Sequence, residues 1–263
     1  MTIRVGVFGA AGRMGRTVCD AVFSDPATEL VAAVDPYHEG LDARTVTGVD
    51  APGLVVGGGC QTMGDARVEV VVDFTEADAA RENLRWCAAN GVHAVVGTTG
   101  LTEDDYDELR GAFTRSNCVV APNFAIGAVL MMRLAEIAAP FFESVEVIEL
   151  HHEGKKDAPS GTAVLTMERI AAASADWMPD PTTNEVIAGA RGGKGPADIS
   201  VHSVRLKGVV AHQEVLFGTT GQTLTIRHDS YDRSSFMPGV LLAVRRVADR
   251  PGVTIGLDAL LDL

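Results

Sequence analysis

Short apolar runs alternate with helix-forming segments through the first half of this 263-residue chain. The runs span residues 3–8, 29–35, 68–74, 93–99 and 118–122, and helical patterns cover 13–23, 76–90 and a stretch from Thr102. Strands that are apolar along their whole length are typical of a sheet buried on both faces, and intervening helices require parallel pairing with right-handed crossovers. The alternation therefore predicts an α/β fold that begins with a Rossmann-type doubly wound parallel sheet.

Several helix boundaries are marked by residues with known preferences for helix ends. Thr75 and Thr102 precede acidic residues and are predicted N-caps, and Gly91 is predicted to end the helix before it. The segment 37–67 is rich in Gly and Asp, so it predicts a loop with at most one short strand.

The pattern changes after Phe124. Helices are predicted over 127–139 and from Gly161, and strands over 145–151, 201–206, 209–217 and 222–230, the last two flanking a glycine-bounded hairpin turn. This order predicts a second, α+β domain with a mixed, largely antiparallel sheet. The glycine-rich stretch 189–195 is predicted to be a mobile loop, and a final helix over 238–248 is predicted to cover the first domain. The predicted domains are thus 1–126 completed by 238–263, and 127–237.

The charge and the cysteines restrict the partners and the compartment. A formal net charge of -13 argues against nucleic acid and anionic membranes as partners, and favours a small-molecule substrate. The most apolar stretch, 124–142, contains Arg133 and Glu136, so it predicts a buried amphipathic helix and not a membrane span. The N-terminus shows no export signal and the four cysteines form no C-x-x-C pair, so we expect free thiols and a cytoplasmic location.

Three glycines follow the first predicted strand at a constant spacing. Gly9, Gly12 and Gly15 stand where a helix begins, and Asp35 ends the second strand twenty residues later. Glycine permits a tight turn and the close approach of a pyrophosphate to the helix N-terminus, and the acid can accept hydroxyls of the adenine ribose. The combination predicts a dinucleotide site; the alternative is a plain tight turn.

Two further strand ends lie at the same predicted edge of the sheet. Gly97, Thr98 and Thr99 follow one strand, and Ala121, Pro122, Asn123 and Phe124 follow another. Ligands of open α/β sheets bind at the carboxyl ends of the strands, so these residues suit contact with the nicotinamide ribose and carboxamide. Ordinary turn chemistry is the alternative for each stretch.

The stretch ELHHEGKKDAPSGTA, residues 149–163, concentrates titratable groups. Adjacent histidines on an extended chain point to opposite faces, so the pair predicts no metal site. Ser160 is a predicted N-cap, and the N–H groups of Gly161, Thr162 and Ala163 would form a seat for a substrate carboxylate. An anion seat, a histidine and a lysine beside a nicotinamide are the parts needed to reduce an electron-poor double bond. The alternative is a polar loop with solvated lysines.

The motif HHEGKKDAPSGT resembles the signature of the 4-hydroxy-tetrahydrodipicolinate reductases (dihydrodipicolinate reductases) of the diaminopimelate route to lysine. GAAGRMG, DFT, VVGTTG, APNFAIGAVL, VHSVR and SFMPGVLLAVR follow the family's order, so the resemblance covers nearly the whole chain. It implies a homotetramer built through the sheet of the second domain, a catalytic His151 and a proton donor at Lys155, with Lys156 in solvent. It also implies substrate contacts from His152, Gly161 and Thr162, and a cofactor site lined by Gly9, Ala10, Ala11, Gly12, Arg13, Met14, Asp35, Gly97, Thr98, Thr99, Ala121, Pro122, Asn123 and Phe124.

One departure from the family pattern leaves the choice between NADH and NADPH open. Many members that prefer the phosphorylated cofactor have a basic residue after the second-strand acid, whereas Asp35 is followed here by Pro36, Tyr37 and His38. Arg13 and Arg16 are the alternative partners for a 2′-phosphate. Two other functions compete with this one. The first is another Rossmann imine or aldehyde reductase of amino-acid metabolism. The second is a non-catalytic dinucleotide sensor, and the intact His151 and Lys155 argue against the sensor.

Overall fold

The structure is a computed structural model that describes residues 2–262. The chain divides into two compact units, Met1–Ile126 with Arg233–Leu263, and Gly127–Asp232. We expected the return to the first unit at Pro238, but it begins at Arg233. The reason is a 3-10 turn, η3 (Arg233–Phe236), which leads directly into the last helix and packs against it.

The first unit is built on a six-stranded sheet in the order β11-β5-β4-β3-β1-β2, and every neighbouring pair is parallel. The order reverses beside β1, which is the position where ligands bind in sheets of this class. The predicted doubly wound sheet is confirmed. Its strands are β1 (Ile3–Phe8), β2 (Thr28–Val34), β3 (Val70–Asp73), β4 (His93–Val96), β5 (Cys118–Val120) and β11 (Val253–Ile255).

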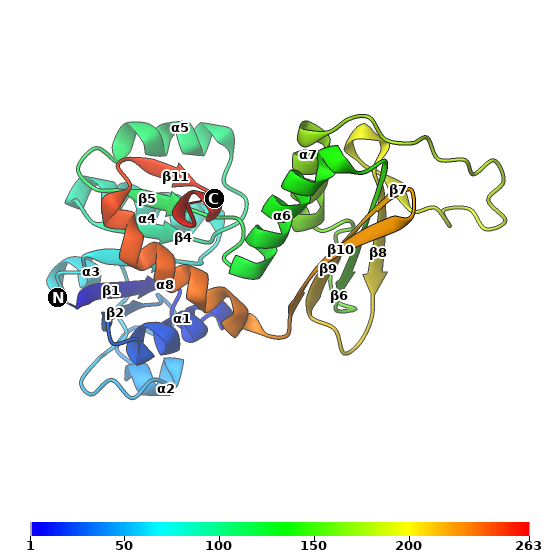
Figure 1. Cartoon of the computed structure of the whole chain (residues 1–263). Helices are drawn as coiled ribbons and strands as arrows, with labels where there is room; N and C mark the ends of the chain where they lie inside the picture. The colour runs from blue at the N-terminus through cyan, green and yellow to red at the C-terminus, as the bar shows by residue number, and fades with distance from the viewer. Residues whose placement is uncertain (1, 263) are drawn as a thin grey trace. The chain divides into compact units, whose positions relative to one another are not determined.

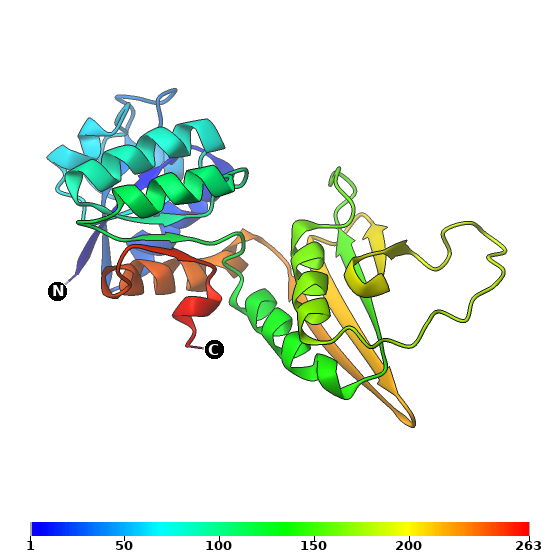
Figure 2. The same ribbon diagram turned by 90° about the horizontal axis from the view of Figure 1, so that it is seen from above.

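Helices cover both faces of this sheet (Figures 1 and 2). α4 (Ala77–Asn90) and α5 (Glu103–Ala112) contact each other on one face, and α1 (Arg13–Ser24) and α8 (Met237–Arg246) contact each other on the opposite face. Two short helices, α2 (Ala43–Thr47) and α3 (Gln61–Asp65), lie where we predicted a loop. That prediction was wrong because five residues are too few to show helical periodicity.

Two of the three helix ends predicted in the first unit are confirmed. Thr102 caps α5 in a capping box with Asp105, and Gly91 ends α4 in the left-handed conformation with φ 70°. Thr75 is not the N-cap of α4; Glu76 takes that position, and the Thr75 hydroxyl donates to Asp73 instead. A nearby carboxylate therefore competed successfully for this hydroxyl.

The second unit contains a five-stranded sheet in the order β10-β9-β6-β8-β7. Only β6 and β8 run parallel, so the predicted mixed, largely antiparallel sheet is confirmed. The short strand β7 lies inside the predicted mobile loop, where it pairs with β8. The strands are β6 (Ser144–His151), β7 (Gly193–Lys194), β8 (Ser200–Arg205), β9 (Ala211–Thr219) and β10 (Gln222–Ser230).

Two helices, α6 (Ile126–Ala138) and α7 (Gly161–Ala173), bury apolar side chains against this sheet. Val147, Val215 and Phe217 from the sheet meet Met167 and Ile170 of α7 in one core. No helix within residues 2–262 is long and apolar enough to cross a membrane. The remaining turns of 3-10 type are η1 (Ala139–Phe141), η2 (Pro196–Asp198), η4 (Val247–Asp249) and η5 (Asp258–Leu260).

Candidate active site

The turn between β1 and α1 depends on its glycines. Gly9 has φ 67°, and a Cβ on Gly15 would lie 2.0 Å from the Gly9 carbonyl oxygen, so neither position accepts a side chain without strain. Gly12 is the N-cap of α1 and has no side chain to satisfy the first-turn N–H groups. Those groups, beginning with Arg13 and Met14, are therefore left for a ligand, and an anion is favoured at this end of a helix.

Asp35 braces this turn from the end of β2. The Ala11 N–H donates to Asp35 Oδ2 over 3.3 Å, and the Tyr37 N–H donates to Oδ1 over 3.1 Å. The ring Nδ1 of His38 lies 2.8 Å from the same Oδ1. Ala10 is fully buried, and its N–H donates to the Val34 carbonyl. The backbone of Ala10 and Ala11 is thus tied to β2 before any ligand binds.

Arg16 is also tied to the turn, because its Nε donates to the Ala11 carbonyl over 2.9 Å. Arg13 and Arg16 are both exposed on the first turn and a half of α1. The guanidinium of Arg16 consequently lies beside the glycine turn, whereas His38 provides an imidazole next to Asp35 that sequence reasoning had not counted as a basic group.

Asp73, at the end of β3, is a fully buried carboxylate that sequence reasoning missed. Its Oδ1 accepts from the Thr75 N–H at 2.8 Å and the Thr75 hydroxyl at 2.6 Å, and the Thr98 hydroxyl lies 3.5 Å away. Its Oδ2 accepts from Asn83 Nδ2 at 2.8 Å. Asp73 therefore fixes the loops that follow β3 and β4. The DFT motif contained the signal, but nothing in the sequence revealed its partners.

The predicted nicotinamide stretches meet at the carboxyl edge of the sheet. A Cβ on Gly97 would lie 2.0 Å from the Phe74 ring, which in turn contacts Phe124 with ring centroids 5.6 Å apart. Asn123 Oδ1 accepts from the Ala125 N–H, which closes the turn after Ala121. Thr98, Ala121 and Phe124 are buried, whereas Thr99 and Pro122 are exposed. The two stretches thus share one small surface.

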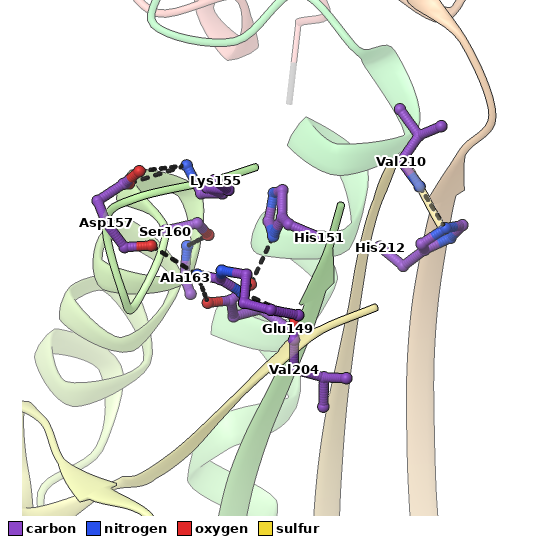
Figure 3. Close-up of polar contacts among 10 residues, drawn as sticks. Glu149, His151, Lys155, Asp157, Ser160, Ala163, Val204, Val210 and His212 are labelled. Carbon is purple, nitrogen blue, oxygen red and sulfur yellow. Dashed lines mark hydrogen bonds and ion pairs between the residues drawn. The ribbon is translucent and has the colours of Figure 1, made fainter. Parts of the chain in front are cut away.

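In the second unit, β6 ends in a carboxylate and an imidazole on the same face. Glu149 is fully buried, and its Oε2 lies 2.5 Å from His151 Nδ1 (Figure 3). Residues two apart on a strand point the same way, which accounts for this contact. His152 points elsewhere and is exposed, and its N–H donates to the Val210 carbonyl.

Arg205, the last residue of β8, completes the cluster from the neighbouring strand. It pairs in register with His151, and its Nη1 and Nη2 donate to Glu149 Oε2 and Oε1, each at 2.9 Å. Nη2 also donates to the Asp157 carbonyl at 2.6 Å. Neither Glu149 nor Arg205 was predicted as a site residue, because their contact depends on the register of two distant strands.

Burial and charge act in opposite directions on this cluster. Burial alone would raise the pKa of Glu149, but hydrogen bonds from Arg205, Ser203 and His151 outweigh it and hold that pKa below its ordinary value. Burial lowers the pKa of His151 and prevails over the opposite influence of Glu149. The geometry and these directions agree on an ionised Glu149 beside a neutral His151 near pH 7.

The loop after β6 carries Lys155 back over the strand end. Its Nζ lies 2.8 Å from Asp157 Oδ2, and its N–H donates to the His152 carbonyl at 3.1 Å. The hydrogen bond from Lys155 holds the pKa of Asp157 below its usual range. Figure 3 shows Lys155 near His151, and its positive charge contributes to the lowered pKa of that histidine. Lys156 is exposed.

Helix α7 begins at this loop. Ser160 is its N-cap, as predicted, and its Oγ accepts from the Ala163 N–H at 3.2 Å. The prediction that the Ala163 N–H joins the anion seat was therefore wrong, because the cap already uses this donor. Gly161 is exposed, Thr162 is half-buried, and the Thr162 carbonyl accepts from the Thr166 hydroxyl at 2.7 Å. The structure therefore places His151, Lys155 and the start of α7 around one strand end.

The cysteines do not contribute a reactive thiol to this site. Cys19, Cys87 and Cys118 are buried, and burial raises the pKa of Cys19 to about 12. In the described part of the chain, no group of three or more His, Cys, Asp or Glu side chains is arranged to hold a metal ion.

Comparisons with known proteins bear on both units. Residues 3–124 match the family model for the N-terminus of dihydrodipicolinate reductase, and residues 127–261 match the model for its C-terminus. The chain is 54% identical to a 4-hydroxy-tetrahydrodipicolinate reductase of Nocardia farcinica, with both chains covered completely. It is 50% identical to a reductase of the same name from Corynebacterium urealyticum, with 99% of each chain covered.

Solved structures agree with these matches. A dipicolinate-bound dihydrodipicolinate reductase from Paenisporosarcina sp. TG-14 superposes with a TM-score of 0.88 at 38% identity, covering 98% of this chain and 99% of that one. An amine dehydrogenase from Mycobacterium smegmatis, at 14% identity and a TM-score of 0.68, shares the fold alone. The two family models and the full-length relatives together show that this chain belongs to the dihydrodipicolinate reductase family.

Proposed function

We propose that the chain reduces 4-hydroxy-tetrahydrodipicolinate (dihydrodipicolinate) to tetrahydrodipicolinate in the diaminopimelate route to lysine. The observation that carries the proposal is the similarity over the full length to relatives of that name, with His151, Lys155 and the start of α7 around one strand end. Family membership supplies the substrate class, and the site supplies a proton donor and an anion seat.

NADH or NADPH would bind the first unit. The shape of the glycine turn fits a pyrophosphate, because a Cβ on Gly15 would collide with the backbone and α1 begins without a side-chain cap. Asp35 would take the adenine ribose, and the surface formed by Gly97, Thr98, Thr99 and the stretch 121–124 would take the nicotinamide end. A bound reduced nicotinamide supplies the hydride.

The second unit would hold the dicarboxylate substrate and supply the proton. Gly161 and Thr162 present first-turn N–H groups behind the Ser160 cap, which suits one carboxylate, and the exposed His152 would contact the substrate nearby. Lys155 carries three donors on a mobile stem and would protonate the atom next to the reduced carbon. His151, neutral and on the same strand end, would orient that proton transfer.

The proposal includes the oligomeric state, the partners and the location of the protein. β10 is nine residues long and pairs on one side only, and most of its first half is exposed. Such an edge is normally covered, which supports a homotetramer built through this sheet. The formal net charge of -13 argues against nucleic-acid and anionic-membrane partners, and the free cysteines support a reducing, cytoplasmic compartment.

The test follows NAD(P)H absorbance with freshly generated product of the preceding synthase as substrate. We expect oxidation of the cofactor that depends on this substrate and is saturable. Turnover of unrelated imines or aldehydes at equal kcat/KM would favour another Rossmann reductase. Cofactor binding without any turnover would favour a dinucleotide sensor.

A further inference from the structure

A charged cluster lies beneath the two residues to which the proposed function assigns the proton transfer, and the inference drawn from it rests on that proposal. Glu149 and Arg205 come from adjacent parallel strands, and both ends of the guanidinium meet both oxygens of the carboxylate. The carboxylate is fully buried, so the pair is screened little by solvent. Removal of one partner would leave the other charge buried and unpaired.

The cluster determines which nitrogen of His151 carries a proton. An ionised carboxylate only accepts hydrogen bonds, so Nδ1 of His151, 2.5 Å from Glu149 Oε2, must carry the hydrogen. In the neutral ring, Nε2 then keeps its lone pair. Because Nδ1 is held at the buried carboxylate, Nε2 is the nitrogen left for the site.

Arg205 connects the same carboxylate to the lysine loop. Besides Glu149, its Nη2 donates to the Asp157 carbonyl at 2.6 Å, and the Asp157 side chain contacts Lys155 Nζ. The loop that carries Lys155 is therefore anchored to the end of β8 as well as to β6. One guanidinium thus holds both the partner of His151 and the segment that presents Lys155.

A second cluster of the same composition serves as an internal comparison. Glu146, three residues earlier on β6, contacts His202 Nε2 at 2.7 Å and Arg191 Nη2 at 2.5 Å. Its side chain is 34% exposed, whereas that of Glu149 is 0% exposed. The same three residue types thus meet twice beside β6, but of these two sets only the buried one touches the proposed proton-transfer groups.

We propose that Glu149 and Arg205 are positioning residues: Glu149 fixes His151 as the tautomer with its proton on Nδ1, and Arg205 keeps Glu149 ionised and anchors the Lys155 loop. The Glu149→Gln variant tests the first part. Arg205 and His151 together place three donors on the two oxygens of Glu149, and a glutamine offers only one oxygen to them. The amide therefore no longer enforces a proton on Nδ1, and the tautomer with its proton on Nε2 gains population. We expect kcat to fall by about tenfold or more with an unchanged dissociation constant for NADH.

The charged groups that face His151 are Glu149 on its own strand, Arg205 on β8 and Lys155 in the following loop. Removing the carboxylate leaves only positive neighbours, so Glu149→Gln should lower the pH at which His151 titrates. Arg205→Gln removes a positive neighbour and should raise that pH. The two variants of one pair are thus expected to shift the titration in opposite directions.

The experiment combines kinetics with ¹⁵N spectra of histidine-labelled protein, in which a His151→Asn variant assigns the ring signals. Wild type should show the proton on Nδ1, Glu149→Gln should show a larger share of the tautomer with the proton on Nε2, and Glu149→Asp should recover part of the lost kcat. Glu146→Gln is the matched control and should retain wild-type kcat and the wild-type His151 tautomer. All proteins are compared at the same oligomeric state.

The spectra of the unmodified enzyme keep the proposal falsifiable even if a variant does not fold. A wild-type His151 with its proton on Nε2, or equal kcat losses in Glu149→Gln and Glu146→Gln, would overturn it. Failure of the wild-type enzyme to reduce the substrate would instead contradict the proposed function, and the tautomer measurement does not depend on that activity.

Discussion

Asp73 in the first unit and Glu149 in the second are both fully buried carboxylates near the end of a strand, yet their partners differ in kind. Asp73 accepts hydrogen bonds from neutral donors, namely a backbone N–H, hydroxyl groups and an amide. Glu149 is held by a guanidinium and an imidazole. The first arrangement fixes the shape of two loops, whereas the second also couples a titrating ring to that shape.

The difference follows from what each unit has to do. A cofactor surface needs fixed backbone and aromatic positions, and Asp73 provides them without any partner that changes charge near neutral pH. A proton-transfer site needs a group whose protonation state is controlled, and we propose that Glu149 controls that of His151. We therefore expect changes in the first unit to alter cofactor binding and stability, and changes in the second to alter kcat and its pH dependence.

The largest effect on kcat should come from Lys155, in the loop after β6. Lys155→Ala removes the proposed proton donor and should lower kcat by about a hundredfold or more. Lys156→Ala, its exposed neighbour, is the matched control and should behave nearly like the wild type. NADH titrations should give the same dissociation constant for both variants. Equal losses of kcat in the two variants would refute the assignment of Lys155.

Asp73→Asn should change the stability and the NADH affinity of the first unit. An amide cannot accept from all the donors that surround Asp73, so we expect a loss of about 2–4 kcal/mol in the free energy of unfolding. Misplaced loops should also raise the dissociation constant of NADH about tenfold, which corresponds to roughly 1.4 kcal/mol. Denaturant unfolding and fluorescence titration measure the two quantities. A stable variant with normal NADH affinity would contradict the role of Asp73 in fixing the two loops.

A planar dicarboxylate tests whether the start of α7 is an anion seat. 2,6-Pyridinedicarboxylate presents two carboxylates and should inhibit in competition with the substrate. Thr162→Val should weaken this inhibition about tenfold, because the variant loses the Thr162 hydroxyl as a donor at the start of α7 and keeps only the backbone N–H groups. Thr182→Val, an exposed threonine in a loop, is the control and should leave the inhibition constant unchanged. Absence of inhibition at millimolar concentration would argue against the seat.

The smallest effect concerns the choice of cofactor. Asp35 brings a negative charge to the proposed position of a 2′-phosphate, while Arg13 and Arg16 offset part of the repulsion. We expect use of both cofactors, with NADH at least as efficient in kcat/KM, and a shift toward NADPH in Asp35→Asn. A preference of tenfold or more for NADPH in the wild type, roughly 1.4 kcal/mol, would show that the basic groups prevail.

The sequence predicted the main strands of both sheets because each is a run of apolar residues long enough to recognise. It missed β7, β11, α2 and α3, which have two to five residues and are too short to show a periodicity. Thr75 was wrongly predicted as an N-cap because its hydroxyl donates to Asp73, two residues earlier. The sequence does not show which of these two hydrogen bonds the hydroxyl makes. Short elements and local competition thus account for these errors in the fold.

The candidate site shows the same limit more sharply. His151, Lys155 and Ser160 lie within one stretch, so the spacing of that stretch was enough to group them. Arg205 is 56 residues from Glu149 in the chain, and their contact exists only because β6 and β8 pair in one particular register. Sequence patterns do not specify such a register, so the group that controls His151 was found only in the structure.

The most direct test of the different roles of Asp73 and Glu149 is the pH dependence of kcat/KM. It is measured for the wild type, Asp73→Asn and Glu149→Gln, for NADH and for the dicarboxylate substrate, in the same buffers. His151 has to be neutral, and burial lowers its pKa from 6.5, so wild-type activity should fall on the acid side only below pH 6.5. We predict the same acid limb for Asp73→Asn, at reduced stability, and a limb displaced to lower pH for Glu149→Gln. An unchanged limb in Glu149→Gln, or a displaced one in Asp73→Asn, would contradict the division of roles between the two buried carboxylates.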